Sequence, residues 1–207
     1  VDGWKALEKI IDYIKSEYPD IFTIADAKRC DIENTSRRYA KAYFERLNFD
    51  SITISPYMGK DSVEPFLKYK EKHTILLALT SNSGANDFQF NQCSGKKLYQ
   101  QVIESSIKWK NSQQLMYVVG ANHTDLISSI RRIVPDNFLL IPGIGAQGGN
   151  LKQISQAAMN DKCGIIVNAS RSIIYSSNGK DFEKTASISA KKIKDEMENL
   201  LKEKKII

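Results

Sequence analysis

The stretch Thr23-Ile24-Ala25-Asp26-Ala27-Lys28-Arg29-Cys30-Asp31-Ile32 begins as an apolar strand and ends in a cluster of charges. The apolar residues at its start favour β structure, and the turn sequence Tyr18-Pro19-Asp20 comes shortly before them. Side chains two apart on a strand share a face, so Asp26 and Lys28 are expected side by side at the strand's carboxyl end. Asp31 follows where the chain leaves the sheet.

These charges have two interpretations. An acid–lysine–acid array favours the ionised forms of its members and suits an enzyme that moves a proton without losing its own charge pattern. Taken alone, such a run is more often a solvated strand end with incidental ion pairs. The other strand ends of the chain decide between the two.

Composition and charge exclude several classes of protein. The chain has 207 residues, 42% hydrophobic and 26% charged, which is typical of one globular domain. The net charge of +6 lies largely in residues 191–194 and 202–205, and the acids Asp195, Glu196 and Glu198 are interleaved with these lysines. This is typical of a solvated helix face, so the charge itself indicates little about partners, and we expect no nucleic-acid partner. Cys30, Cys93 and Cys163 are widely spaced, which favours a reducing cytoplasm over disulfides or zinc. Neither a membrane span nor a signal peptide is expected.

Hydrophobic periodicity predicts strands that alternate with helices along the whole chain. The expected strands lie at about 21–28, 51–54, 73–80, 115–120, 138–141 and 164–168. The expected helices lie at 3–17, 34–48, 61–70, 96–110, 124–134, 150–159 and 181–204, with a long loop at 81–95. Apolar strands alternating with helices predict an α/β fold with a parallel sheet covered by helices.

Two α/β architectures fit this alternation, an open doubly wound sheet and a (β/α)₈ TIM barrel. A barrel needs eight strands and about 250 residues. The helix at 3–17 should follow a strand that is not in the sequence, and the first residue is Val1 and not Met. We therefore expect residues 1–207 to form a single barrel domain whose first one or two βα units, roughly 40–60 residues, lie upstream.

A glycine-rich segment, Pro142-Gly143-Ile144-Gly145-Ala146-Gln147-Gly148-Gly149, follows a predicted strand and opens a helix. It contains G-x-G-x-x-G, the dinucleotide fingerprint, but that fingerprint belongs in the first βαβ unit with an acid about 20 residues on. The next strand ends instead in Asn168-Ala169-Ser170-Arg171, without an acid. Barrel enzymes often hold phosphate between the loops after strands seven and eight, so a phosphate site is favoured over a plain turn.

Assembled in order, these motifs resemble the orotidine 5′-phosphate decarboxylase family, in its longer bacterial and parasite branch. The matching segments are Asp26-Ala27-Lys28-Arg29-x-Asp31-Ile32, Ser55-Pro56-Tyr57-Met58-Gly59-x-Asp61-Ser62, Thr80-Ser81-Asn82, residues 142–149 and Asn168-Ala169-Ser170-Arg171-Ser172-Ile173-Ile174-Tyr175. The resemblance implies a barrel, a homodimer with shared active sites, and neither metal nor organic cofactor. It implies conversion of orotidine 5′-monophosphate to uridine 5′-monophosphate (UMP) and CO₂ in pyrimidine synthesis.

The resemblance also implies roles for the charged residues. Lys28 would protonate C6 of the pyrimidine as CO₂ leaves, and Asp26 would lie beside the substrate carboxylate. Asp31 would reach in from the partner subunit, accompanied by Ile32 and Thr35.

Substrate binding falls on a second set of residues in the same resemblance. Ser81 would hydrogen-bond the pyrimidine ring. Gln147 and Arg171 would hold the phosphate, helped by Gly148 and by the backbone around Ser170.

The chain departs from the family pattern in two places. Cys30 stands where glycine is expected, and a further lysine of the family's array belongs to a preceding strand that this sequence does not contain. Two alternatives stay open: a magnesium-dependent phosphosugar lyase or decarboxylase of the same barrel group, and a non-enzymatic basic module that binds phosphate or nucleic acid. His73 and His123 have no partner at metal-ligand spacing and are interpreted as structural.

Overall fold

The computed structural model describes residues 1–144 and 150–207 and has an α/β fold, as predicted. Its main sheet has the strand order β1-β2-β3-β6-β7-β8. These strands are Ile24–Arg29 (β1), Ser51–Ile54 (β2), His73–Leu79 (β3), Leu115–Val119 (β6), Leu139–Pro142 (β7) and Ile165–Asn168 (β8). The pairings β1–β2, β2–β3, β6–β7 and β7–β8 are parallel, as helical crossovers between successive strands require.

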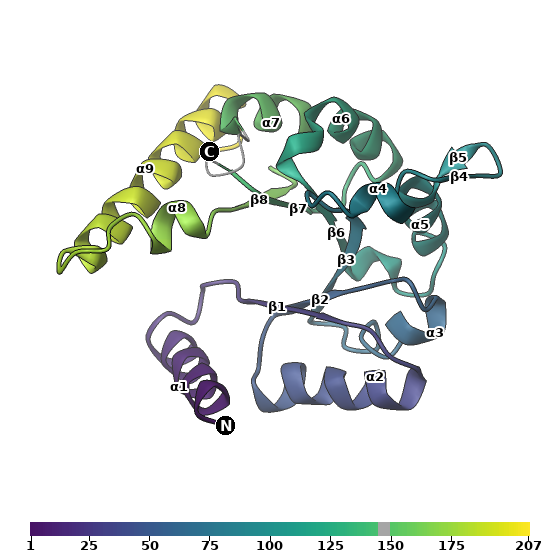
Figure 1. Cartoon of the computed structure of the whole chain (residues 1–207), viewed down its shortest axis with the longest axis horizontal. Coiled ribbons are helices and arrows are strands. Elements are labelled where there is room, and N and C mark those ends of the chain that lie inside the picture. Colours follow the sequence, from purple (N-terminus) through teal and green to yellow (C-terminus); the bar gives the residue numbers. More distant parts are fainter. Residues whose placement is uncertain (145–149) are drawn as a thin grey trace. The chain divides into compact units, whose positions relative to one another are not determined.

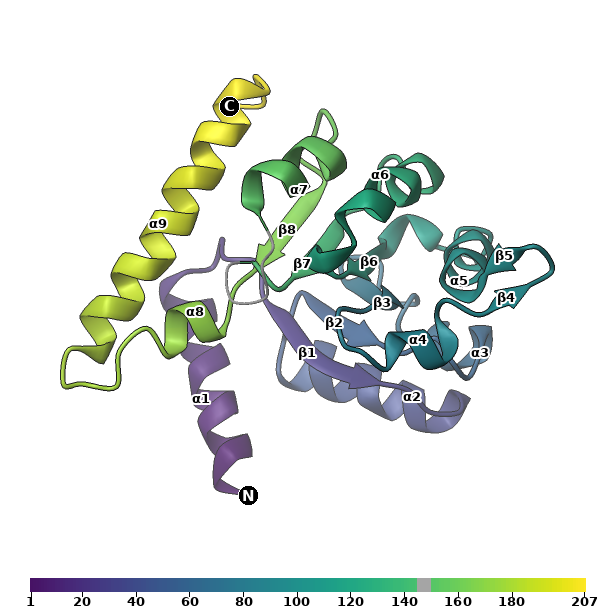
Figure 2. The ribbon, with the colours of Figure 1, turned by 45° about the horizontal axis from the view of Figure 1, so that its top comes forward.

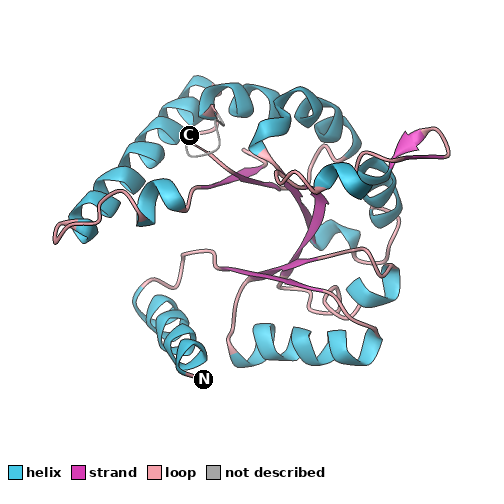
Figure 3. Cartoon of the chain, viewed as in Figure 1, coloured by secondary structure: helices cyan, strands magenta, loops and turns pink. Residues whose placement is uncertain are grey.

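Helices separate the strands along the chain (Figures 1 and 3). The α-helices are Asp2–Glu17 (α1), Glu33–Ala40 (α2), Lys60–Val63 (α3), Ala85–Phe88 (α4), Leu98–Ser106 (α5), Thr124–Ile133 (α6), Leu151–Ala158 (α7), Arg171–Ile174 (α8) and Phe182–Glu203 (α9). A π-helix, Lys41–Arg46 (η1), continues α2, and two 3₁₀ turns are Ser112–Gln114 (η2) and Ala121–His123 (η3). In the part of the chain that the structure describes, no helix is long and apolar enough to cross a bilayer.

The chain divides into two compact units, and the first comprises Val1–Leu77 and Ser105–Met116. In this unit α2 and η1 run alongside β1 and β2 (Figure 1). Its core is built from side chains of the strands and of the segment after α3, among them Ile52, Ile54, Phe66 and Leu76, all fully buried. Because this core is closely packed, it fixes the positions of β1 and β2 and of the residues at their carboxyl ends.

A cluster around Asp50 joins α1 to the strands of the first unit. The Lys15 ammonium donates to both Asp50 carboxylate oxygens, at 2.7 and 2.6 Å. The backbone N–H and the hydroxyl of Thr23 each donate to Asp50 Oδ2 at 2.7 Å. Burial by itself would raise the pKa of Asp50, but these hydrogen bonds and the Lys15 charge outweigh it and hold the pKa below its ordinary value.

The second unit comprises Ala78–Glu104 and Tyr117–Ile207. Here α6 packs beside α7, and both α7 and α8 pack against the long helix α9 (Figures 1 and 2). The buried core lies between these helices and the strands and includes Ile127, Ile130, Leu139, Ile141 and Ile154. A small antiparallel hairpin, Gln92–Cys93 (β4) with Lys96–Lys97 (β5), extends away from the second unit's strands (Figure 2).

Arg131, in the last turn of α6, hydrogen-bonds to three segments of the second unit. Its guanidinium donates to backbone carbonyls of Val134, Pro135 and Asn137 in the following loop. It also donates to Ala158 at the end of α7, at 2.8 Å, and to Gly164 just before β8, at 2.7 Å. Burial lowers the pKa of Arg131 from its ordinary value, and the nearby charge of Asp136 opposes that shift.

Several predicted elements differ from those observed. The helix expected at 61–70 is only Lys60–Val63, because Pro65 has no N–H to donate and its ring hinders a continuing helix. The helix expected at 34–48 changes to a π-helix at Lys41, where Leu47 N–H donates to Ala42 C=O. The loop expected at 81–95 contains α4 and the first strand of the hairpin. The short helix α8 was not predicted.

Candidate active site

Asp26 and Lys28 form an ion pair at the carboxyl end of β1. Lys28 Nζ lies 2.5 Å from Asp26 Oδ1. The two side chains are 53% (Lys28) and 63% (Asp26) exposed in this chain, so a ligand can reach the pair from solvent. The predicted proximity of these two residues is therefore confirmed.

A break in the pairing of β1 with β2 accompanies this proximity. On β1, Ala25 pairs with Ile52 and Arg29 pairs with Ile54, so four steps along β1 match two steps along β2. The extra length forms a β-bulge at residues 26–28, and Lys28 adopts a left-handed backbone with φ of 47°. Bulges and positive φ at non-glycine residues are uncommon, cost free energy and concentrate at functional sites.

Thr53, the residue of β2 that faces this bulge, is fully buried. Its hydroxyl accepts a hydrogen bond from Lys28 N–H at 2.9 Å and donates to Asp26 Oδ1 at 3.0 Å. Nothing in the sequence singles out Thr53, because an isolated threonine in a short apolar strand is an ordinary β-former.

Arg29, at the end of β1, is anchored on aromatic rings of α2 and η1. Its guanidinium donates to the Tyr43 hydroxyl at 3.0 Å and lies 5.2 Å from the centroid of the Tyr39 ring. Tyr43 also lines a pocket of about 420 Å³ that has Asp26, Ala27 and Arg29 in its wall. Cys30, which follows, is a half-buried free thiol, and nothing in the structure explains its presence there.

Asp31, Ile32 and Thr35 lie at the start of α2. The Asp31 carboxylate accepts a hydrogen bond from Ile32 N–H at 2.7 Å, and among the described residues it forms no ion pair with Lys28. Ile32 is 61% exposed, and Thr35 is half-buried. In this chain the Asp31 carboxylate is thus bonded to its own neighbouring backbone.

Ser81 lies on a loop that is held in place from several directions. Asn122 Nδ2 donates to Ser81 C=O at 3.3 Å, and His123 Nε2 lies 3.0 Å from Thr80 C=O. Gln89 accepts from Thr80 N–H and donates to the Thr80 hydroxyl, both at 2.8 Å.

Gly120 lets the Ser81 loop come close to the chain after β6. A Cβ atom at Gly120 would lie 2.9 Å from Ser81 Cα, a contact that no side chain tolerates. His123 also contacts this loop: its ring lies 3.0 Å from Thr80 C=O and 5.5 Å from the ring of Phe90. These contacts agree with the structural role predicted for His123.

The predicted phosphate site falls in the second unit. Gln147 and Gly148 lie outside the described residues. Ser170 and Arg171 follow β8, and Ser170 donates to Asn168 Oδ1 at 3.2 Å. Arg171 is exposed and, within the described part of the chain, has no ion-pair partner, so its guanidinium is open to an anion.

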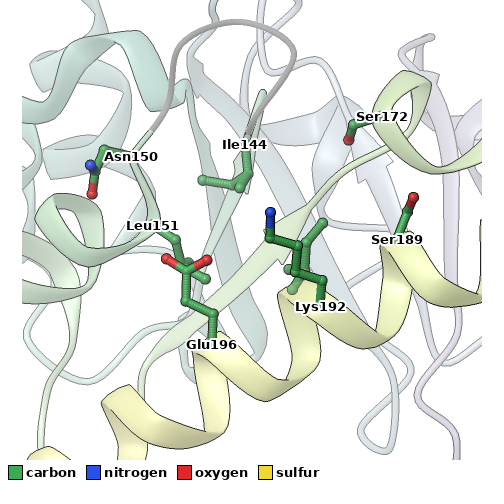
Figure 4. Close-up of a pocket in the computed structure, with 8 residues that line it drawn as sticks. Ile144, Asn150, Leu151, Ser172, Ser189, Lys192 and Glu196 are labelled. Carbon is green, nitrogen blue, oxygen red and sulfur yellow. The ribbon is translucent and has the colours of Figure 1, made fainter. Parts of the chain in front are cut away.

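A pocket of about 400 Å³ adjoins this region (Figure 4). Figure 4 shows Lys192 and Glu196 extending from α9 toward Ile144 and Leu151. Ser172, one residue after Arg171, also lines the pocket.

Residues 1–144 and 150–207 contain no group of three or more His, Cys, Asp or Glu side chains placed to hold a metal ion.

Comparison with known proteins identifies the family. The model of the orotidine 5′-phosphate decarboxylase / HUMPS family matches residues 2–184. The chain belongs to this family. Orotidine 5′-phosphate decarboxylase of Flavobacterium johnsoniae is 59% identical over 204 residues, which is 99% of this chain and 75% of that protein. The enzyme of the same name from Bacteroides fragilis is 52% identical over 203 residues, 98% of this chain and 74% of its own length.

Solved structures agree with the family assignment. The structure of Leishmania donovani OMP decarboxylase superimposes with a TM-score of 0.83 at 33% identity, over 97% of this chain and 75% of that one. The (β/α) architecture expected from the sequence is therefore confirmed, and the chain spans about three quarters of the length of these relatives. The individual residue roles stay predictions.

Proposed function

We propose that this protein converts orotidine 5′-monophosphate to UMP and CO₂. The observation that carries the proposal is the Asp26–Lys28 ion pair on the bulge at the end of β1. Family membership and the names of the close relatives support it. We further propose a cytoplasmic homodimer that acts without metal or organic cofactor, with residues 1–207 belonging to one barrel domain.

The proposed chemistry gives Lys28 two tasks. The bond between C6 and the carboxylate breaks, its electron pair stays on C6, and CO₂ leaves. The Lys28 ammonium stabilises that charge and then gives its proton to C6, and Lys28 regains a proton from water. Asp26 holds the ammonium in place and would lie beside the substrate carboxylate, where repulsion is relieved as CO₂ departs.

The binding roles are distributed over the second unit. Ser81 would hydrogen-bond the pyrimidine, and Arg171 with Gln147, Gly148 and Ser170 would hold the phosphate. An open guanidinium can bind a phosphate through two parallel hydrogen bonds. Binding energy from the phosphate is then available for positioning the reacting ring.

The direct test is decarboxylation by the natural polypeptide that carries these residues. We expect loss of orotidine 5′-monophosphate absorbance with equal release of CO₂, unchanged by a metal chelator. A folded protein that leaves the substrate intact would refute the proposal. Activity that disappears with chelator and returns with Mg²⁺ would favour the magnesium-dependent lyase instead.

Mixing two inactive variants tests the shared site. If Asp31 serves the partner subunit, Lys28→Met and Asp31→Asn homodimers each lack one essential group in both of their sites. A mixed dimer then contains one site with both natural residues. Refolding the two variants together should restore up to about a quarter of wild-type activity, since statistically half of the dimers are mixed and each has one intact site. Activity no greater than the sum of the separate variants would contradict the assignment of Asp31.

A further inference from the structure

We infer that Thr53 is a positioning residue that fixes Asp26 and Lys28 for the proposed decarboxylation. The inference rests on that proposed function and adds to it a residue that the sequence motif does not contain. Thr53 lies on β2, and the three residues of the bulge face it across the parallel pairing.

Three hydrogen bonds form a closed ring around the Thr53 hydroxyl. Lys28 N–H donates to Thr53 Oγ1 at 2.9 Å, and Thr53 Oγ1 donates to Asp26 Oδ1 at 3.0 Å. Asp26 Oδ1 in turn accepts from Lys28 Nζ at 2.5 Å. One buried hydroxyl therefore fixes both the backbone of the lysine and the carboxylate that holds its ammonium.

The hydroxyl has a single proton, so its second possible acceptor matters. Ala25 C=O lies 3.5 Å from Thr53 Oγ1, at the limit of a hydrogen bond. Asp26 Oδ1 is closer and charged, and hydrogen bonds to charged acceptors are stronger. The proton is therefore assigned to Asp26.

Burial explains why the ring needs Thr53. The side chains of Asp26 and Lys28 are more than half exposed, and exposed long side chains sample many rotamers. Thr53 is 0% exposed and lies in the packed strand β2, so it is the rigid member of the ring.

The bulge gives the same hydroxyl a second task. Lys28 has a left-handed backbone, which residues other than glycine seldom adopt, and its N–H is satisfied by the Thr53 hydroxyl. Without that acceptor, the bulge loses the bond that opposes its relaxation to a regular ladder. Thr53 contacts no reacting atom in this scheme and acts only through Asp26 and Lys28.

The test compares two substitutions at Thr53 with a matched control. Thr53→Val keeps the side-chain shape and removes the hydroxyl, whereas Thr53→Ser keeps the hydroxyl. Thr74→Val is the control, because Thr74 on the neighbouring strand is 1% exposed and its hydroxyl has no hydrogen-bond partner among the described residues. Each variant is measured for kcat, for UMP affinity and for thermal unfolding, with kcat expressed per UMP-binding site.

We expect Thr53→Val to lower kcat by about 10- to 100-fold while the Kd for UMP changes less than about threefold, since a misplaced catalytic group costs rate more than product binding. Thr53→Ser should stay within about fivefold of wild type, and Thr74→Val within about twofold. If Thr53→Val fails to fold, Thr53→Cys, whose thiol is a weak hydrogen-bond donor, should show the same loss of kcat. A kcat for the folded Thr53→Val or Thr53→Cys variant equal to that of Thr74→Val would overturn the inference. That outcome differs from failure of the proposed function, in which wild type itself does not decarboxylate the substrate.

Discussion

Replacing Lys28 by methionine is expected to lower the rate of orotidine 5′-monophosphate decarboxylation by at least about 10⁴-fold, because the change removes both the proton donor and the charge that stabilises the developing carbanion. Methionine keeps the length and apolar stem of the side chain but has no ammonium. The affinity for UMP should change by less than about tenfold, because UMP carries no negative charge at C6 for the ammonium to stabilise. Single-turnover kinetics and product titration measure the two quantities separately.

A matched lysine shows whether the loss is specific to Lys28. Lys202, on α9, is 58% exposed and bonds Glu198 at 2.7 Å, which closely resembles the exposure and pairing of Lys28. Lys202→Met should leave turnover within about twofold, since exposed ion pairs contribute little. Turnover by Lys28→Met within tenfold of that control would refute the role of Lys28.

For Arg171, in the proposed phosphate site, the expected loss is in binding affinity and not in the rate of the chemical step. Arg171→Ala should weaken UMP binding by about 10- to 100-fold through loss of charge-assisted hydrogen bonds, and should leave uridine binding unchanged because uridine has no phosphate. Equal affinity of Arg171→Ala and wild type for UMP would contradict the assignment of Arg171.

The sequence predicts the α/β alternation well because each strand is a short apolar run and each helix has its own periodicity. It also predicts the proximity of Asp26 and Lys28, which the structure shows. It does not predict the bulge on which they lie, because a bulge is a property of two paired strands, here β1 and the residue Thr53 of β2. No pattern within residues 23–32 contains that information. The expected helix at 61–70 is a different kind of error, because Pro65 is visible in the sequence and marks its end.

Arg131 illustrates the same limit for stability. In the sequence it is a basic residue in the last turn of a helix, followed by Arg132, and both look like solvated charges that favour the helix dipole. Only the fold brings the carbonyls of a loop, of the end of α7 and of the residue before β8 around one guanidinium. Because these carbonyls come from segments far apart in the sequence, no local sequence pattern predicts that they surround Arg131.

We expect Arg131→Met to lower the free energy of unfolding by about 3 kcal/mol, since five carbonyls lose a charged donor, of which Gly164 C=O keeps the N–H of Leu139 and Pro135 C=O keeps the amide of Asn160. For a chain of this size the change corresponds to a fall in Tm of roughly 6–12 °C. Urea unfolding and calorimetry at one fixed protein concentration measure it. Arg131→Lys should recover less than half of the loss, because an ammonium is a point donor and cannot span acceptors on three segments as the planar guanidinium does.

Arg132→Met is the matched control, because Arg132 is the adjacent residue on the same helix and is exposed. It removes the same charge and the same near-dipole interaction but none of the five hydrogen bonds, so its cost should stay within about 0.5 kcal/mol. The difference between the two variants therefore isolates the carbonyl cluster from the general effect of removing a positive charge near a helix end. Equal stability of Arg131→Met and Arg132→Met would mean that water replaces the guanidinium at these carbonyls without loss, and that the cluster does not hold α6, α7 and β8 together.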